Sequence, residues 1–305
     1  MSKTYLSAPL PFQGQKRIFL RRFKEHLKRI TNQITMIVDL FGGSGLLAHT
    51  AKRLCPWCEV IYNDFDDYHI RLEHVNETNE ILGFVREKIK GLKPKQRVPD
   101  DIHDQICDHL EQKLKEYSYL DWRTLAADLL FPNNLGDTLD FFRRELFWVL
   151  VPRTNYKVDG YLDGINIVKK DYSILAQEVI RRTGGGKNVL FLADPPYMGT
   201  NVDSYTGKCW SVQDYLKVPM VLDGLNFVYF TSMKSKILEI YEFFCKNKGF
   251  QSPFFSCRME DVRVCLSYVG QYTDVMVSHF LPGCYQEEPL LPKIDERLIY
   301  NKIDF

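Results

Sequence analysis

The sequence predicts an α/β protein with a mostly parallel sheet and one helical insertion. Short apolar runs alternate with helical stretches at both ends of the chain, whereas a long middle portion contains charged helices and no strand. Alternation of strands and helices is typical of parallel βαβ units. The 305 residues suffice for one large domain with an inserted module. We therefore expect residues 1–70 and 157–305 to form one α/β domain and residues 71–156 to form the insertion.

The first βαβ unit lies near the N-terminus. Met36 to Leu40 is an apolar run, followed by the loop Phe41-Gly42-Gly43-Ser44-Gly45 and a helical stretch from Leu46 to Leu54. Glu59 to Tyr62 is a second strand, which ends at Asn63-Asp64. Two strands on either side of a crossover helix predict a parallel pair with a tight glycine loop after the first strand.

The segment before this unit is basic. Between Met1 and Thr35, Glu25 is the single acid, against Lys3, Lys16, Arg17, Arg21, Arg22, Lys24, Lys28 and Arg29. Two interpretations stay open. The segment is either a solvated amphipathic helix or a surface that contacts phosphates directly. The apolar stripe of such a helix would be Ile18, Phe19, Phe23, Leu27 and Ile30.

The middle portion has no α/β alternation. Helices are expected at Asp101–Tyr117 and Thr138–Leu150, with turns at Leu92–Pro99 and Phe131–Asn134. A further helix is expected at Lys234–Lys246. Val269-Gly270-Gln271 indicates a hairpin between the last two strands. Strands after the insertion are predicted at Ile165–Val168, Val189–Ala193, Asn226–Thr231, Val262–Tyr268 and Asp274–Phe280.

Composition excludes several classes of protein. A hydrophobic content of 45%, a charged content of 26% and a net charge of +1 are those of an ordinary globular chain. Neither a long apolar span nor a signal peptide is evident, which predicts an intracellular protein without membrane contact whose eight cysteines are thiols. Cys55-Pro56-Trp57-Cys58 suggests zinc or redox chemistry, but no second ligand pair accompanies it. We expect no metal.

Asp194-Pro195-Pro196-Tyr197 is the strongest local signal. It follows the predicted strand Val189–Ala193, and ligands bind at the carboxyl ends of strands in open α/β sheets. The amino nitrogen of adenine is a poor nucleophile, so a methylating site must hold it with acceptors, such as a carboxylate and a carbonyl fixed by prolines. A tyrosine provides a flat face on which a base can stack. The alternative is an ordinary turn, because Asp-Pro is common in turns.

The second signal is the segment Asp39 to Gly45. Its glycines permit a sharp turn and close approach of the backbone to a ligand. The G-G-x-G spacing and the lack of a following Lys-Ser/Thr argue against a dinucleotide or nucleoside triphosphate. Asp64 ends the next strand, where it could bind ribose hydroxyls or cap the following helix.

Taken together, these segments resemble the Dam-type, or D12, class of DNA adenine N6-methyltransferases. Pro11 to Lys16 looks like the family's P-F-x-G-x-K motif, and Asp194 to Tyr197 matches its catalytic D-P-P-Y, with further likeness from Met198 to Tyr205. The resemblance covers roughly residues 9–70 and 160–280. The unmatched block lies where this class inserts its target-recognition domain.

The resemblance implies a Rossmann-like S-adenosylmethionine-dependent methyltransferase fold, with seven strands and an antiparallel last strand. It implies direct methyl transfer to a flipped-out adenine of double-stranded DNA, with S-adenosyl-L-homocysteine as product. A prokaryotic or phage source, and a cognate restriction enzyme as partner, are expectations of the same kind. The catalytic residues would be Asp194, Pro195, Pro196 and Tyr197. Cofactor binding would fall to Phe12, Lys16, Asp39, Phe41, Gly42, Gly43, Gly45, Asp64 and Asp171.

Alternatives of other classes stay open. Adenine in RNA shares the same chemistry, and a catalytically silent nucleic-acid-binding paralogue would keep the fold without turnover. Cytosine N4 and protein glutamine targets fit less well, because those enzymes more often carry S-P-P-x and N-P-P-Y at the position of Asp194 to Tyr197. Within the insertion, the acidic stretch Asp100–Glu111 disfavours DNA, so contact is expected from Arg143 to Lys157. The recognition sequence and the oligomeric state are not predicted.

Overall fold

The computed structural model describes residues 4–131, 134, 136–198, 210–233, 235–248, 252–254, 257–267 and 270–286. Most of the expected motif continuation from Met198 to Tyr205 lies outside these residues.

A seven-stranded sheet forms the centre of the molecule, with strand order β3-β2-β1-β4-β5-β7-β6. β1 to β5 pair in parallel, and β7 runs antiparallel to both β5 and β6. The expected α/β fold with an antiparallel last strand is therefore confirmed. The strands are β1 (Met36–Asp39), β2 (Glu59–Asn63), β3 (Asn166–Val168), β4 (Val189–Ala193), β5 (Asn226–Ser232), β6 (Arg258–Ser267) and β7 (Gly270–His279).

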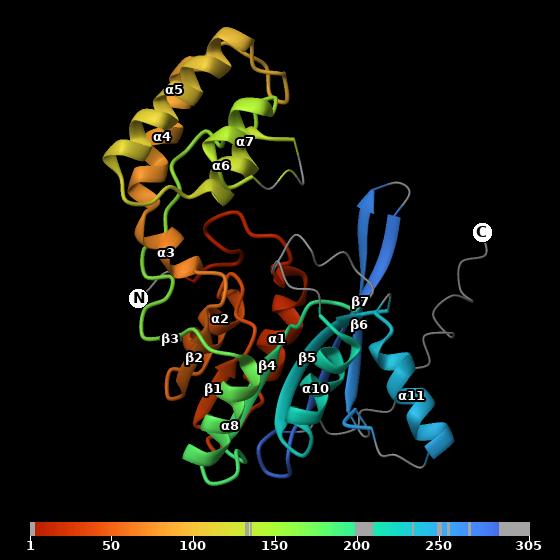
Figure 1. Ribbon diagram of the computed structural model, residues 1–305. Helices are drawn as coiled ribbons and strands as arrows, with labels where there is room; N and C mark the ends of the chain where they lie inside the picture. The colour runs from red at the N-terminus through yellow and green to blue at the C-terminus, as the bar shows by residue number, and fades with distance from the viewer. Residues whose placement is uncertain are drawn as a thin grey trace, which may run out of the picture.

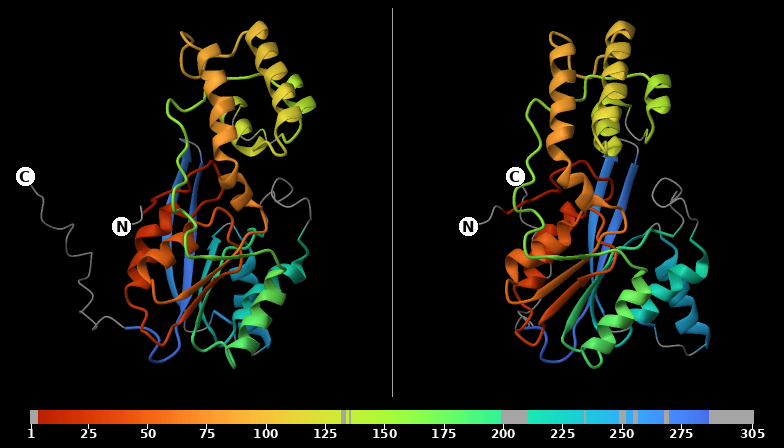
Figure 2. Two further views of the ribbon diagram at one scale, coloured as in Figure 1. Left: turned by 90° about the vertical axis from the view of Figure 1, so that its left-hand side faces the viewer. Right: turned by 60° about the vertical axis from the view of Figure 1, so that its left-hand side comes forward.

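Helices cover both faces of this sheet (Figures 1 and 2). One face packs against α8 (Tyr172–Arg182), α10 (Val212–Leu222) and α11 (Ile237–Lys248). The other packs against the short 3-10 helix η1 (Arg17–Phe19), α1 (Leu20–Leu27) and α2 (Leu46–Leu54). The central strands β1, β4 and β5 are buried along their whole lengths, as expected for parallel strands covered on both sides.

The basic N-terminal segment forms the amphipathic helix that was one of its two interpretations. Phe19, Phe23, Leu27 and Ile30 of the apolar stripe are buried against the sheet, whereas Ile18 is 39% exposed. Burial of four of these side chains explains the periodicity without any appeal to phosphate contact.

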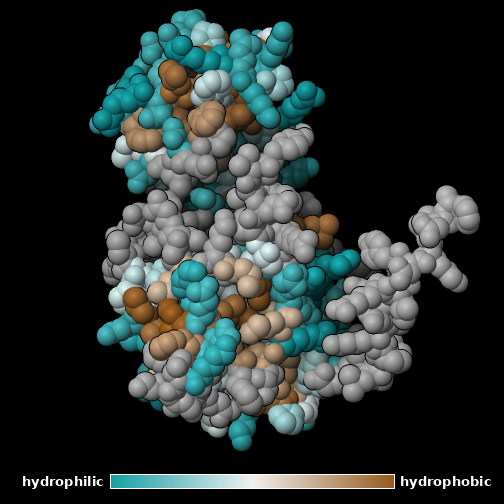
Figure 3. Space-filling view, turned by 90° about the vertical axis from the view of Figure 1, so that its right-hand side faces the viewer, coloured by the Kyte–Doolittle hydropathy of each residue, from teal (hydrophilic) through white to brown (hydrophobic). Residues whose placement is uncertain are grey.

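The insertion between β2 and β3 is helical and has its own apolar core. Five helices follow the carboxyl end of β2, and the visible face of this part is largely hydrophilic around a small apolar patch (Figures 1 and 3). Ile81, Leu110, Leu125 and Phe142 are among the side chains fully buried in this core. The helices are α3 (Tyr68–Glu73), α4 (Val75–Lys88), α5 (Asp100–Glu116), α6 (Trp122–Leu129) and α7 (Leu139–Arg144).

Two sequence-based boundaries are wrong. The helix expected at Thr138–Leu150 ends at Arg144, because Phe147 pairs as an isolated bridge with Leu130 and accepts a backbone hydrogen bond from Val98. This tertiary pairing satisfies backbone groups that a longer helix would otherwise satisfy. The predicted connection Val269-Gly270-Gln271 is too long, since β7 already begins at Gly270.

A buried ion pair joins two helices of the insertion, and its arginine also contacts the N-terminal segment. Arg71 in α3 contacts Asp121 at 2.9 Å and also donates to the carbonyl of Pro11 and to the hydroxyl of Thr124. Asp121 also caps α6 by accepting from the backbone of Thr124. Both charged side chains are nearly inaccessible, so removing one leaves the other without its counter-charge.

We predict that Asp121→Ala lowers the free energy of unfolding by about 3–5 kcal/mol, because the Arg71 charge would stay buried without its partner. Chemical denaturation measures this change. Glu242→Ala is the matched control: it breaks the exposed pair with Lys246, and because water screens that pair it should change the free energy of unfolding far less. Equal losses in the two variants would contradict a structural role for the buried pair.

Among the described residues, no helix is both long and apolar enough to span a bilayer.

Candidate functional site

A cavity of about 470 Å³ opens at the carboxyl ends of β1, β2 and β4, within the size range of small-molecule sites. This is the edge at which ligands bind in open α/β sheets. The cavity brings together segments that are distant in the sequence. Its lining is Phe12, Gln13, Gly14, Lys16, Leu40, Phe41, Gly42, Gly43, Asn63, Phe65, Asp66, Lys170, Asp171, Tyr172, Asp194, Pro195, Pro196, Tyr197, Trp210 and Asp214.

The glycine loop after β1 is held in place by the end of β2. Tyr62 donates its hydroxyl to the carbonyl of Gly43 at 2.6 Å, and the amide of Asn63 donates to Leu40 at 2.9 Å. A Cβ added at Gly42 would overlap the ring of Tyr62. Glycine is therefore required there by close packing, and the loop leaves open space on its cavity side.

Phe12 covers the loop from the opposite side. Its ring lies 3.1 Å from the position that a Cβ on Gly43 would take, and the φ of Gly43 is +49°. A side chain at Gly43 would thus be both crowded and strained. The N-terminal segment and the glycine loop together form one narrow end of the cavity.

The acid of the D-P-P-Y segment is paired with a lysine from the N-terminal segment. Lys16 Nζ lies 2.6 Å from Asp194 Oδ2, donates to the carbonyl of Gly14 at 2.8 Å and lies 5.3 Å from the ring centre of Tyr197. Burial raises the pKa of Asp194, and the Lys16 charge opposes that rise. The lysine therefore keeps a carboxylate with free acceptor capacity at the cavity wall.

Three aromatic side chains form part of the cavity lining. The ring of Phe41 lies 4.9 Å from that of Tyr172, and Tyr172 stacks on Trp210 with ring centres 6.0 Å apart. Sequence reasoning missed Tyr172 and treats the tryptophans as packing residues. Trp210 packs against the core and also lines the cavity, and no periodicity in the sequence separates these two roles.

One of two comparisons with known proteins found a relative of this chain. No family model matches the sequence. A protein of Haemophilus influenzae described as "Putative methyltransferase" is 33% identical over 290 residues, which span 91% of this chain and 94% of that protein. The chain belongs to the family of this methyltransferase. The observed strand order, with its antiparallel β7, is typical of the S-adenosylmethionine-dependent methyltransferase fold.

Within this methyltransferase fold, most of the residues singled out from the sequence line the cavity, but Asp39, Gly45 and Asp64 do not. Gly45, with φ +71°, is the N-cap residue of α2. Asp64 is fully buried and accepts hydrogen bonds from the backbone of Tyr68 and His69 in the first turn of α3. Of its two open interpretations, the structure supports capping of the helix.

Asp66 occupies the position at the cavity that the sequence suggested for Asp64. It lines the cavity together with the half-exposed Phe65, whereas Asp64 points into α3. Asp171 also lines the cavity, and its carboxylate accepts from the backbone of Ser173 at the start of α8. The sequence Asn-Asp-Phe-Asp does not indicate which of its two acids lies at the cavity, because this depends on the direction that the chain takes after β2.

Arg143, a basic side chain of the insertion that was expected to contact DNA, is already paired with acids. Arg143 pairs with Asp108 at 3.1 Å and Glu111 at 2.8 Å, both on α5. The acidic stretch that argued against DNA contact therefore neutralises the arginine that was expected to make it. Arg153 is exposed, so contact from the later part of Arg143–Lys157 stays a prediction.

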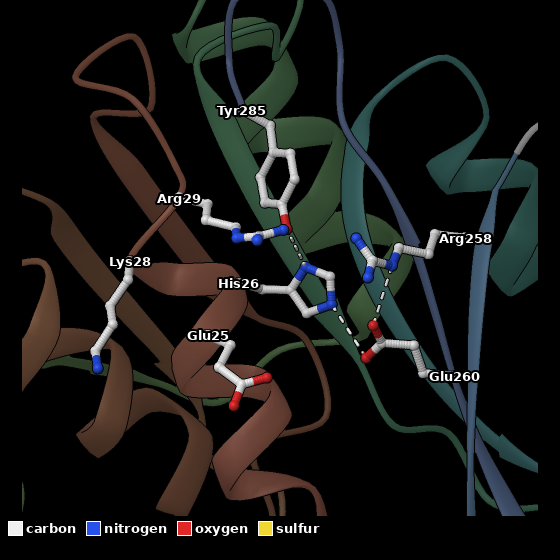
Figure 4. A pocket seen from close by; sticks show the side chains of 7 residues that line it. All are labelled: Glu25, His26, Lys28, Arg29, Arg258, Glu260 and Tyr285. Carbon is white, nitrogen blue, oxygen red and sulfur yellow. Dashed lines mark hydrogen bonds and ion pairs between the residues drawn. The ribbon is translucent and has the colours of Figure 1, made fainter. Parts of the chain in front are cut away.

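A second cavity, of about 200 Å³, lies beside α1 (Figure 4). Its central groups bond one another: His26 Nδ1 contacts the hydroxyl of Tyr285 at 3.0 Å, and Nε2 contacts Glu260, which also pairs with Arg258. Lys28 and Glu25 extend away from this network (Figure 4). Internal pairing of these groups indicates a link between α1, β6 and the chain after β7.

Asp39 is the most unusual buried group near the main cavity. It ends β1, is 1% exposed, and neither carboxylate oxygen has a hydrogen-bond partner of full geometry among the described residues. Burial and the neighbouring Asp194 raise its pKa to about 7, although the amides of Phe41 and Ala48 favour its charged form. An orphaned buried carboxylate behind a cavity is costly, which suggests a functional reason for its presence.

We predict that Asp39→Asn stabilises the folded protein at pH 8 by a few kcal/mol, because the folded pKa of about 7 exceeds the ordinary value of 3.8. For such a group, stability is fully present below pH 4 and is lost as the pH rises through 7. The difference between the variant and the unchanged protein should therefore vanish near pH 4. Thermal unfolding across this range measures it, with the exposed Asp163→Asn as control.

Proposed function

We propose that the protein is a Dam-type methyltransferase that transfers a methyl group from S-adenosylmethionine to N6 of adenine in double-stranded DNA. One observation carries the proposal: Asp194 to Tyr197 lines the same cavity as the glycine loop, with Asp194 paired to Lys16. The acceptors for an amino group and the glycine loop that would bind a nucleoside-like cofactor thus line the same cavity.

The lining fits the cofactor chemically. Gly42 and Gly43 line the cavity, so their backbone can lie against the methionyl part. Asp66 offers acceptors for ribose hydroxyls, and the half-exposed Phe65 offers a flat face for adenine. When bound, S-adenosylmethionine supplies an electrophilic methyl group on a sulfonium sulfur.

The residues of the D-P-P-Y segment act on the target base. One oxygen of Asp194 is held by Lys16, which leaves the other to accept an amino hydrogen, while the carbonyl of Pro195 accepts the second. Two acceptors draw the amino nitrogen toward tetrahedral geometry and free its lone pair for in-line attack. Transfer of the methyl group to this nitrogen would leave a neutral thioether, and the excess amino proton would pass to water. Tyr197 stacks on the base.

DNA is favoured over RNA as the substrate by the helical insertion. It follows the carboxyl end of β2, so it stands on the same edge of the sheet as the cavity (Figure 1). Extrusion of a base from a duplex costs a few kcal/mol and needs contacts outside the base pocket. A folded unit beside the cavity supplies a surface for such contacts.

Incubation of the purified protein with S-adenosylmethionine and unmethylated genomic DNA, with RNA in parallel, tests the proposal. Mass spectrometry of the digested nucleosides should show N6-methyladenine from DNA only. Asp194→Ala should lose about 1000-fold or more in rate, yet still fold and unfold cooperatively. Product from RNA alone would move the substrate assignment, and turnover by Asp194→Ala would remove this acid from the mechanism.

Asp66 and Asp64 should give opposite phenotypes. We predict that Asp66→Asn weakens S-adenosylmethionine binding about tenfold with little change in stability, because its carboxylate faces the cavity. Asp64→Ala should instead lower the free energy of unfolding by about 1–2 kcal/mol, since it removes the acceptors for two backbone amides of α3. Calorimetric binding and thermal unfolding of both variants measure this, and the reverse pattern would restore Asp64 as the ribose ligand.

A further inference from the structure

We propose that Asp39, Asp194 and Asp274 form a carboxylate cluster that selects the sulfonium cofactor over its thioether product by charge, and that binding of the cation displaces a proton from the cluster. This inference rests on the proposed function, because it assumes S-adenosylmethionine as the ligand. It adds Asp274, a residue outside the sequence motifs, and a physical basis for product release.

The three acids lie on one face of the sheet. In β1, Ile37 is buried in the core beneath α1 and α2, and Asp39 follows two residues later. Leu192 of β4 belongs to the same core, and Asp194 follows it by two. Because side chains of a strand alternate between faces with a period of two, both acids extend from that face at the carboxyl edge.

β7 brings the third acid to the same place from the opposite direction. Met276 lies in the same core, and Asp274 precedes it by two residues. β7 runs antiparallel to β5, so earlier residues of β7 lie closer to the carboxyl edge, and Asp274 pairs with Ser232, the last residue of β5. Asp274 is 6% exposed, and its Oδ1 has no hydrogen-bond partner within the described part of the chain.

One ammonium serves all three carboxylates. Lys16 contacts Asp194 directly, and its charge lowers the pKa of Asp39 and of Asp274. Asp194 in turn raises the pKa of both other acids, which places all four groups within one electrostatic cluster. Three carboxylates facing one ammonium leave two negative charges in excess when all are ionised.

The other titratable groups that face the cluster do not supply the missing positive charge. Tyr62 and Tyr161 lie beside Asp39, and Tyr229 lies beside Asp194. Burial raises the pKa of each of these phenols, so they stay neutral between pH 5 and 8. Ser232 donates a neutral hydrogen bond to Asp274. The cluster therefore has to retain a proton or receive a cation.

Burial favours the protonated form of two of the acids. Burial raises the pKa of Asp274 to about 6, as it raises that of Asp39 to about 7. A sulfonium at the cavity would supply positive charge where the cluster lacks it and lower both values, so a proton leaves. The thioether product has the same carboxylate, amino, ribose and adenine groups but no charge on sulfur. The difference between the two ligands isolates the effect of that single charge.

Isothermal titration of the full chain with S-adenosylmethionine and with S-adenosylhomocysteine tests the inference. Runs at pH 6.5 in buffers of different ionisation enthalpy give the number of protons released by each ligand. We expect more protons to be released with S-adenosylmethionine, and its affinity relative to the product to rise several-fold from pH 5.5 to 7.5. Equal proton numbers and a constant affinity ratio would overturn the inference while leaving the cofactor assignment intact.

Asp274→Asn removes one charge of the cluster without changing the shape of the side chain. We expect the preference for S-adenosylmethionine and the difference in proton release both to fall about threefold or more. Asp171→Asn is the control, because Asp171 lines the cavity outside the cluster and should weaken both ligands equally. If Asp274→Asn fails to fold, the pH dependence of the affinity ratio in the unchanged protein tests the inference by itself. Binding of neither ligand would refute the proposed function itself.

Discussion

The ion pair between Lys16 and Asp194 is the contact on which the site depends. It joins the segment before α1 to the end of β4, and both side chains are largely buried at the cavity wall. Without Lys16, Asp194 would face Asp39 and Asp274 with no counter-charge, and burial would favour its neutral form. A neutral acid has less capacity to accept an amino hydrogen. Lys16 therefore favours the ionised form of this buried carboxylate.

Lys16 can do this only because the N-terminal segment is fixed at a second point. Tyr68 bonds both backbone groups of Leu10, and Arg71 donates to the carbonyl of Pro11. Both anchors belong to α3, the first helix of the insertion. Phe12 lies between these anchors and Lys16 and covers the glycine loop. The insertion thus helps to build the end of the cavity that the glycine loop forms.

The sequence was most informative where local chemistry and chain direction coincide. The glycine loop and the D-P-P-Y segment each follow an apolar strand, so their position at the carboxyl edge could be predicted from periodicity and motif alone. The end of α7 could not, because Phe147 is held by backbone pairing with Leu130. Asp66 and Asp274 were missed for a related reason: their roles depend on where the chain turns after β2 and on the antiparallel course of β7.

Asp39 and Asp274 are buried acids whose carboxylates are not fully hydrogen-bonded within the described residues. A carboxylate such as Asp39 destabilises the folded state at neutral pH, and a sheet that needed only stability would have an apolar residue there. This destabilisation is confined to the carboxyl edge of the sheet. The rest of β1 and β4 packs against apolar cores on both faces. Under the proposed selection by charge, a ligand that brings positive charge would relieve this cost on binding, and part of its affinity would derive from the repulsion among the three acids.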